Sequence, residues 1–374
     1  MWKPPILIPQ SLSTNMDRVF KVLLLSFLLM PLWTVAQNAA YDEEEIVVNY
    51  SQEGHDVTLT GTLTIPNNTV AKQKRFPAVV LVSGSGQQDR DETLMGHKPF
   101  RAIAEYFAQQ GIATLRYDDR GVGGSKGDLE TATTYDFADD AEAMFMELRK
   151  HPKIDPKRVG IVGHSEGGAI APMIAARNKK VSFVVMLAGQ GCTGAEVLLQ
   201  QNRAIFQLKG IADSLIDVRI RCMEAYFDAM KRVAPEQYDS VFKSIANTYA
   251  GHLTKKQRRT VGVLGGDAYL FAQQFRTTPW WRAFILMDPA DYLPKVKCPI
   301  LALNGDKDCQ VIAEPNLDAI KRLAKKSKLT THLFPDKNHL FQTCTTGAVE
   351  EYSTLSEDIA PDVLELMTKW ILGI

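Results

Sequence analysis

The sequence predicts an α/β protein in which a mostly parallel, doubly wound sheet carries an inserted helical cap. Short apolar runs alternate with amphipathic helical stretches from about residue 77 to residue 191, and the strand pattern resumes at residue 299. This alternation is typical of a parallel sheet. Residues 196–290 instead show long helical periodicity and no convincing strand. We therefore expect a core built from residues 37–191 and 296–374, with a cap at 192–295.

The expected elements of the core follow one another in a regular order. A first β section covers 46–50 and 57–65, where apolar and polar residues alternate around Gly61. Continuous apolar runs then predict buried strands, and amphipathic stretches between them predict helices. The strands are expected at 77–82, 112–117, from 159 onward, 183–188, 299–304 and 329–334, and the first two helices at 99–110 and 136–149.

Residues 1–36 have the organisation of a signal peptide. Arg18 and Lys21 form a short basic region, residues 22–33 are apolar, and small residues lead to Ala36. The apolar run is too short to span a bilayer comfortably, although an N-terminal membrane anchor is the alternative. We expect cleavage near Ala36, a periplasmic or secreted mature protein, and no stable membrane span after processing.

Charge and cysteine usage exclude several classes of protein. Lys+Arg and Asp+Glu both number 43, and nucleic-acid binding requires a concentrated basic face. The basic run at 255–259 is predicted to be a solvated helix face, so we expect no nucleic-acid partner. The five cysteines show no C-x-x-C spacing, and neither a metal site nor a cofactor motif is indicated. Cys309 and Cys344 are expected to be either disulfide-bonded or two buried free thiols.

The most informative motif is G-x-S-x-G at residues 163–167. It lies between an apolar run and a stretch of small, helix-tolerant residues. This is the layout of a strand-turn-helix elbow that exposes the hydroxyl of Ser165. Gly163 and Gly167 flank the serine where side chains would collide with neighbouring backbone. The motif predicts a nucleophilic serine.

An acid and a base follow in the order that such a serine needs. Asp308 comes after the strand predicted at 299–304, and His339 comes after the strand predicted at 329–334. These positions converge at one edge of a parallel sheet. Imidazole, with a usual pKa near ~6.5, can accept and return a proton near neutrality. Asp306, two residues before Asp308, is the alternative acid.

Two further groups of residues are expected beside Ser165. An oxyanion needs preorganised donors, for which we predict the backbone N–H groups of Glu166 and of Ser85 in the loop 83–86. The Glu166 carboxylate is expected to face the cleft, a basic neighbour or solvent. Trp280, Trp281 and Phe284 end the predicted cap, where they serve either plain packing or substrate contact.

These motifs resemble the α/β-hydrolase superfamily over residues 43–374. The chain is similar to secreted bacterial serine esterases and to dipeptidyl-aminopeptidase and acylaminoacyl-peptidase relatives. The resemblance implies Ser165 as nucleophile, Asp308 as acid and His339 as base. One departure is Ser83-Gly84, where many members have His-Gly. The matching segments are 82–86 with 89–92, 116–123, 163–168, 304–311 and 338–342.

Three functions are compatible with the sequence. The first is hydrolysis of carboxylic esters through an acyl-enzyme, with a small-molecule ester as substrate and no cofactor. The second is an exopeptidase with the same triad and a short peptide substrate, which would need an acidic anchor for the free amino terminus. Asp89, Asp91, Glu92 or Glu166 could supply that anchor. The third is a catalytically silent binding protein, against which the complete set of Ser165, Asp308 and His339 argues.

Overall fold

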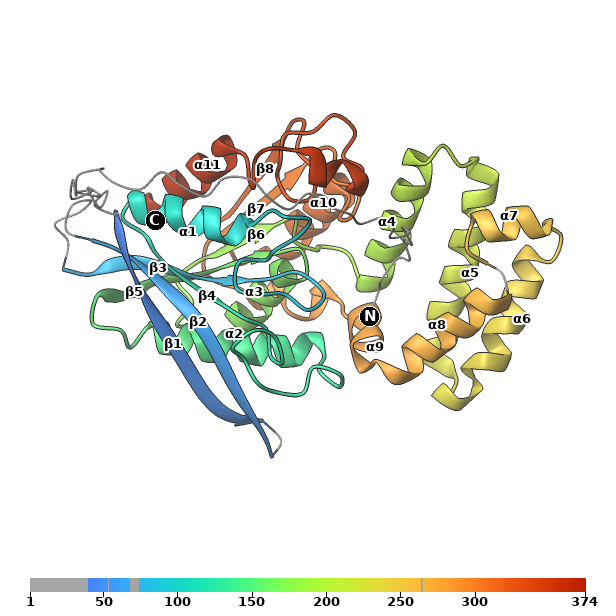
Figure 1. The fold of residues 1–374 in the computed structure, drawn as a ribbon, viewed down its shortest axis with the longest axis horizontal. Helices are drawn as coiled ribbons and strands as arrows, with labels where there is room; N and C mark the ends of the chain where they lie inside the picture. The colour runs from blue at the N-terminus through green and yellow to red at the C-terminus, as the bar shows by residue number, and fades with distance from the viewer. Residues whose placement is uncertain (1–39, 53, 68–73, 264) are drawn as a thin grey trace, which may run out of the picture. The chain divides into compact units, whose positions relative to one another are not determined.

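The core of the protein is an eight-stranded sheet with the strand order β1-β2-β4-β3-β5-β6-β7-β8 (Figure 1). This computed structural model describes residues 40–52, 54–67, 74–263 and 265–374; the predicted signal peptide, residues 1–36, lies outside the described residues. β1 and β2 pair antiparallel, as do β2 and β4, and every other pairing is parallel. The strands are β1 (Tyr41–Gln52), β2 (His55–Pro66), β3 (Phe76–Val82), β4 (Ala113–Tyr117), β5 (Ile154–His164), β6 (Val184–Leu187), β7 (Ile300–Gly305) and β8 (Leu329–Phe334).

Helices cover both faces of this sheet. One face packs against α1 (Pro99–Gln109) and α11 (Pro361–Leu372), whose apolar side chains join those of the central strands in one buried cluster. The other face packs against α2 (Thr134–Leu148), α3 (Glu166–Arg177) and α10 (Ala313–Leu323). The predicted fold class is confirmed.

Two strands, β1 and β5, begin five residues earlier than the apolar pattern indicates. β1 starts at Tyr41 because it pairs with β2 along its whole length, although its acidic run, Glu43–Glu45, hides the strand pattern. β5 starts at Ile154, which pairs with Phe76 ahead of a register irregularity. Both additions lie at the start of strands, away from the carboxyl edge that carries the candidate site.

Between β6 and β7, the described residues form helices and contain no strand. The segment begins at α4, where Thr193 and Glu196 form a reciprocal capping box. Its interior is an aromatic cluster in which Phe242 stacks on Tyr226 at 4.5 Å and on Tyr238 at 5.2 Å between ring centroids. The helices are α4 (Gly194–Leu208), α5 (Asp213–Arg232), α6 (Tyr238–Ala250), α7 (Lys255–Thr260), α8 (Gly265–Thr277) and α9 (Pro279–Leu286). Figure 1 shows α5 to α8 set apart from the sheet, with α4 and α9 nearer to it.

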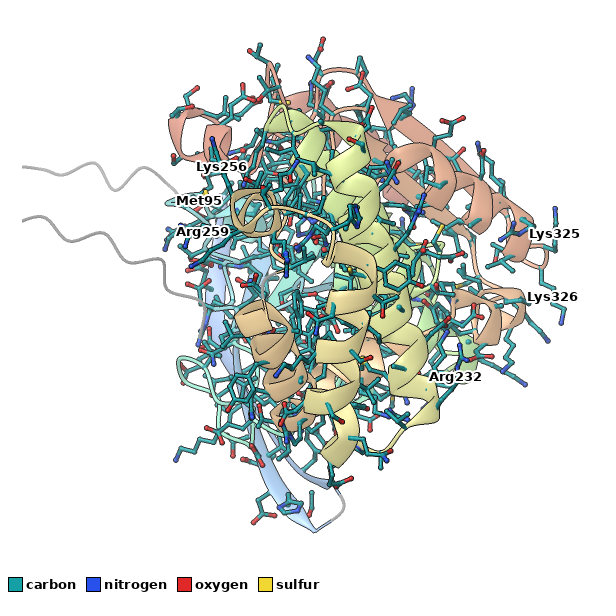
Figure 2. The ribbon with its side chains drawn as sticks, turned by 90° about the vertical axis from the view of Figure 1, so that its right-hand side faces the viewer. Met95, Arg232, Lys256, Arg259, Lys325 and Lys326 are labelled. Carbon is teal, nitrogen blue, oxygen red and sulfur yellow. The ribbon has the colours of Figure 1, made fainter. Side chains whose placement is uncertain are left out.

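The basic run at 255–259 occupies the short helix α7. Lys255, Lys256 and Arg259 are exposed there. Figure 2 shows Lys256 and Arg259 well apart from other exposed basic residues such as Arg232 and Lys325. The run is therefore a solvated helix face, as expected.

Candidate functional site

Ser165 occupies the turn between β5 and α3. Its backbone has φ 55° and ψ −116°, a strained conformation for a residue with a side chain. A Cβ on Gly163 would lie 1.9 Å from the carbonyl oxygen of Gly167, and a Cβ on Gly167 would lie 2.1 Å from that of Val82. Only glycine fits at either position, so the motif encodes the tight turn that presents Ser165.

The loops after β7 and β8 bring Asp308 and His339 together. Nδ1 of His339 lies 2.8 Å from Oδ2 of Asp308, and both side chains are buried. The other carboxylate oxygen, Oδ1, accepts the backbone N–H groups of Gln310 and Val311 at 2.8 and 2.9 Å. Asp306 is exposed. The structure thus pairs His339 with Asp308 rather than with Asp306.

The loop that carries Ser85 lies directly against Ser165. A Cβ on Gly84 would be 3.1 Å from the Cβ of Ser165. The Gly84 N–H donates to Oε1 of Glu92 at 2.7 Å, so this amide is already used. Ser85, the next residue of the loop, and Glu166, the residue after the nucleophile candidate, stay the predicted backbone donors.

A buried carboxyl, Asp119, holds this loop from behind. It accepts the Ser83 hydroxyl at 2.8 Å and the Gln88 N–H at 3.0 Å. Burial raises the pKa of Asp119 to about 8. The side chain lies at the end of β4, so another strand end contributes to the site.

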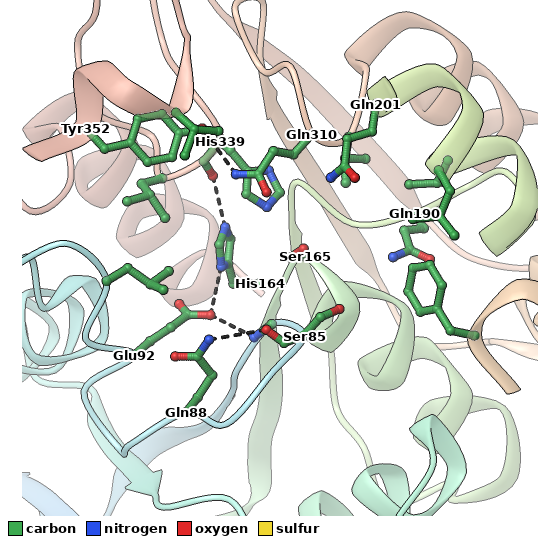
Figure 3. Close-up of a pocket in the computed structure, with 18 of the residues that line it drawn as sticks. Ser85, Gln88, Glu92, His164, Ser165, Gln190, Gln201, Gln310, His339 and Tyr352 are labelled. Carbon is green, nitrogen blue, oxygen red and sulfur yellow. Dashed lines mark hydrogen bonds and ion pairs between the residues drawn. The ribbon is translucent and has the colours of Figure 1, made fainter. Parts of the chain in front are cut away.

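A second acid–histidine pair was not recognised from the sequence. Nδ1 of His164 lies 2.8 Å from Oε1 of Glu92, and Nε2 lies 2.9 Å from the carbonyl oxygen of His339. The His164 ring lies 4.7 Å from that of His339, centroid to centroid, and both side chains line one cavity. Figure 3 shows the chain of bonds from Gly84 through Glu92 to His164 and His339.

The protonation of His164 follows from its two partners. A carbonyl oxygen can only accept, so Nε2 carries a proton. Burial alone would lower the pKa of His164, but the neighbouring Glu92 carboxylate outweighs it and raises the pKa above the usual value. When Nδ1 is protonated as well, the pair is an imidazolium and a carboxylate, and the raised pKa favours this state. The pair is tied to the loop of Gly84 and to the backbone of His339.

The Glu166 side chain corrects an expectation. Its carboxylate faces neither solvent nor a basic neighbour, and Glu166 is not among the described residues that line the cavity beside Ser165; it is 1% exposed. Thr134 Oγ1 donates to it at 2.5 Å, and the indole N–H of Trp280 donates at 2.8 Å. Burial raises the pKa of Glu166, while hydrogen bonds from Thr134, Ser85 and Trp280 oppose the rise. Glu166 therefore joins the elbow to α2 and to α9 of the cap.

These groups surround a cavity of about 340 Å³. Ser165 and His339 lie in its wall, as Figure 3 shows, and Trp280, Trp281 and Phe284 line it from α9. Among the described residues that line the cavity, Glu92 is the only carboxylate, and there is no lysine or arginine. The described lining of the cavity is therefore rich in aromatic rings and side-chain amides, and its one carboxylate, Glu92, is paired with His164.

Cys309 and Cys344 are free thiols in the structure. Cys309 Sγ lies 3.2 Å from the carbonyl oxygen of Gly347, to which it donates. Of the two expected alternatives, the structure shows the two buried free thiols and not a disulfide. Burial raises the pKa of Cys309 to about 12 and that of Cys344 to about 11, which keeps both protonated near neutrality.

The described residues contain neither a membrane-spanning helix nor a metal-binding cluster. No helix among them is long and apolar enough to cross a lipid bilayer. Within the same ranges, no group of three or more His, Cys, Asp and Glu side chains could hold a metal ion.

Known proteins resemble the chain in both sequence and fold. A family model described as serine aminopeptidase, S33, matches residues 97–343. Esterase EstD of Thermotoga maritima is 29% identical over 334 residues, which cover 88% of this chain and 68% of the esterase. Thiohydrolase apmlB of Arthrinium phaeospermum is 25% identical over 291 residues, 70% of this chain and 88% of that protein.

A solved structure shows the same fold at low sequence identity. Proline iminopeptidase from Mycobacterium smegmatis has a TM-score of 0.51 and 14% identity, and the match covers 88% of this chain and 98% of that one. Together with the parallel sheet, this agrees with the resemblance found in the sequence. The chain belongs to the serine aminopeptidase (S33) family of the α/β-hydrolase superfamily, and it is an enzyme, a serine hydrolase.

Proposed function

We propose that the protein hydrolyses carboxylic esters through an acyl-enzyme on Ser165. The observation that carries the proposal is the buried Asp308–His339 pair at 2.8 Å, whose histidine lines the same cavity as Ser165 on its strained turn. In this arrangement Nδ1 of His339 is bonded to the acid, and Nε2 is the nitrogen left to exchange a proton with substrate and serine.

The reaction proceeds in two balanced halves. His339 takes the hydroxyl proton as Ser165 Oγ attacks the ester carbonyl carbon, and Asp308 stabilises the imidazolium that forms. The backbone N–H groups of Ser85 and Glu166 stabilise the oxyanion, each contributing about 3–4 kcal/mol. The C–O bond then breaks, and His339 gives its proton to the departing alcohol. Water repeats the sequence on the acyl-enzyme and releases the acid.

An ester is favoured over a peptide with a free amino terminus because the candidate acidic anchors have partners within the protein. Asp89 accepts two backbone N–H groups and the hydroxyl of Thr93. Asp91 is ion-paired with Lys98 and Arg116. Glu166 is buried and bonded as described above, and Glu92 is buried and paired with His164 through Oε1, while its Oε2 has no hydrogen-bond partner among the described residues. An ammonium group in the cavity would therefore lose solvation and meet only a carboxylate whose charge is already paired within the protein.

The test compares two substrate classes and one covalent probe. We expect purified protein to hydrolyse nitrophenyl acyl esters much faster than aminoacyl nitroanilides. We also expect a fluorophosphonate to label the wild type and to leave Ser165→Ala unlabelled. Equal labelling of Ser165→Ala would remove the nucleophile assignment. Faster cleavage of the anilides would transfer the proposal to the exopeptidase, and absence of both labelling and turnover would support a binding protein.

We also propose that residues 1–36 direct export, with cleavage near Ala36. The support is the basic, apolar and small-residue pattern of that segment. Mass spectrometry of the mature N-terminus, combined with cell fractionation, tests the proposal. An intact N-terminus in the membrane fraction would favour the anchor instead.

A further inference from the structure

A buried amide in the wall of the cavity has an oxygen without a donor. Gln190 follows β6, the strand that pairs with the end of β5, and it lines the same cavity as Ser165 (Figure 3). It is 1% exposed. No described residue donates a hydrogen bond to its Oε1. Buried carbonyl oxygens are nearly always bonded, so this oxygen lacks the partner that such a group usually has.

The backbone on both sides of Gln190 is fixed. The Ala188 N–H donates to Leu303 at 2.9 Å, and the Gly191 N–H donates to Oδ1 of Asn316 at 3.0 Å. A Cβ on Gly191 would lie 2.2 Å from the carbonyl oxygen of Asn316. This close packing holds Gln190 at the cavity wall, where a shift of the main chain towards another donor is blocked.

The surroundings determine which donor fits. The one carboxylate among the described residues that line the cavity, Glu92, is paired through Oε1 with His164, and its Oε2 has no hydrogen-bond partner. Its charge is already balanced within the protein by His164, so a cationic donor would find no unbalanced carboxylate there. The cavity wall contains further neutral amides, Gln201 and Gln310, and an aromatic surface in which Trp280 stacks on Phe284 at 4.9 Å. A neutral hydroxyl on an otherwise apolar or aromatic group meets these conditions.

We propose that Gln190 Oε1 forms a subsite that accepts a hydrogen bond from a hydroxyl group of an uncharged ester substrate. The subsite rests on the proposed esterase function and specifies its substrate class: esters that carry a hydroxyl remote from the scissile bond. A site that bonds a hydroxyl discriminates against analogues that lack it, because the buried acceptor is then left unpaired.

The experiment uses matched esters that differ at one group. In one arm the hydroxyl is on the acyl side, as in ethyl 3-(4-hydroxyphenyl)propanoate and its 2- and 3-hydroxy isomers. In the other arm it is on the alcohol side, as in 2- to 6-hydroxyalkyl acetates. Each is compared with its unsubstituted parent and with its methyl ether, which keeps the oxygen and removes the donor. We expect at least one hydroxy ester to exceed both analogues by about tenfold or more in kcat/KM.

Variants assign that preference to Gln190. Gln190→Met removes the acceptor at similar volume, so the ratio of hydroxy to plain ester falls towards one. Gln190→Glu keeps an acceptor oxygen in place and retains the preference. Gln109→Met, at an exposed glutamine of α1, is the matched control and leaves the ratio unchanged.

The possible outcomes distinguish failure of the Gln190 subsite from failure of the proposed esterase function. Hydrolysis of plain esters without a hydroxyl preference in either arm overturns the subsite alone. So does a methyl ether that matches its hydroxy ester, or a preference that survives in Gln190→Met. If no ester is hydrolysed in any arm, the proposed esterase function fails, and the subsite fails with it.

Discussion

The two buried acid–histidine pairs of this protein have equal bond lengths and different surroundings. Asp308–His339 and Glu92–His164 both join a carboxylate oxygen to Nδ1 at 2.8 Å. In the first pair, no backbone group of the described residues is bonded to Nε2 of His339. In the second, Nε2 is bonded to the carbonyl oxygen of His339 itself.

This difference determines which pair can act as a base. A general base must have a nitrogen that can take a proton from the reacting group. His164 has both nitrogens bonded to oxygens, so it cannot exchange a proton without breaking the bond to His339. Glu92–His164 is therefore a positioning pair. It connects the loop of Gly84 to the loop of His339, and the two pairs lie 4.7 Å apart, ring to ring.

The largest effect is expected at the acid of the first pair. Asp308→Asn should reduce kcat by about 10⁴-fold, because an amide neither fixes the reactive tautomer nor stabilises the imidazolium. Asp306→Asn is the matched control two residues away and exposed, so kcat should change little. Steady-state kinetics on a nitrophenyl ester measure both. If Asp306→Asn proved the more damaging variant, His339 would have to change its partner during catalysis.

A smaller loss is expected at the acid of the second pair. Glu92→Gln keeps the shape but removes the charge that stabilises the His164 imidazolium and weakens the bond from Gly84. We expect kcat to fall about 10- to 100-fold, as for a modest displacement of catalytic groups, with a lower Tm. Glu130→Gln, at an exposed glutamate, is the control. A loss equal to that of Asp308→Asn would mean that Glu92–His164 takes part in proton transfer.

The pH dependence of stability tests the charge on His164. Its folded pKa is raised, so the folded protein binds more protons than the unfolded one above about pH 6.5. This contribution to the free energy of unfolding is fully present below that pH and is lost as pH rises through the folded pKa. Asp119 has a pKa raised to about 8, so it also makes the free energy of unfolding fall as pH rises. This contribution is present in both wild type and variant and largely cancels in the difference between them.

The measurement is the difference in free energy of unfolding between wild type and Glu92→Gln from pH 5.5 to 9. We expect the difference to be largest at the acidic end and to shrink as pH rises. A difference independent of pH would show that His164 is neutral in the folded protein.

The two pairs also differ in how far the sequence predicts them. Asp308 and His339 each follow a strand whose apolar run is visible in the sequence, and parallel strands bring their carboxyl ends together. Glu92 follows no strand: it lies in a loop with φ 52°, and its partner His164 is distant in sequence. The buried Glu166 and the unpartnered Gln190 escaped prediction for the same reason. Their burial depends on the packing of α2, α9 and α10, and no sequence pattern near Glu166 or Gln190 indicates that packing.

Glu166 extends the comparison to a buried acid that has no histidine. Its contact with Trp280 joins the elbow to α9 of the cap at 2.8 Å, so it has a positioning role like that of Glu92. Trp280→Phe should lower the free energy of unfolding by about 1–2 kcal/mol, as for one lost hydrogen bond to a buried carboxyl group. We expect KM to rise several-fold because Trp280 lines the cavity, whereas kcat should change less than threefold.

A double-mutant cycle assigns this effect to the hydrogen bond. Glu166→Gln keeps an acceptor oxygen for the indole and should cost less than Trp280→Phe. In the double variant the bond is already absent, so the two stability losses should sum to more than the measured loss. Chemical denaturation of the four proteins gives the coupling energy. Strict additivity would mean that Trp280 stabilises the cap through ring packing alone, and that the elbow and the cap are energetically independent at this contact.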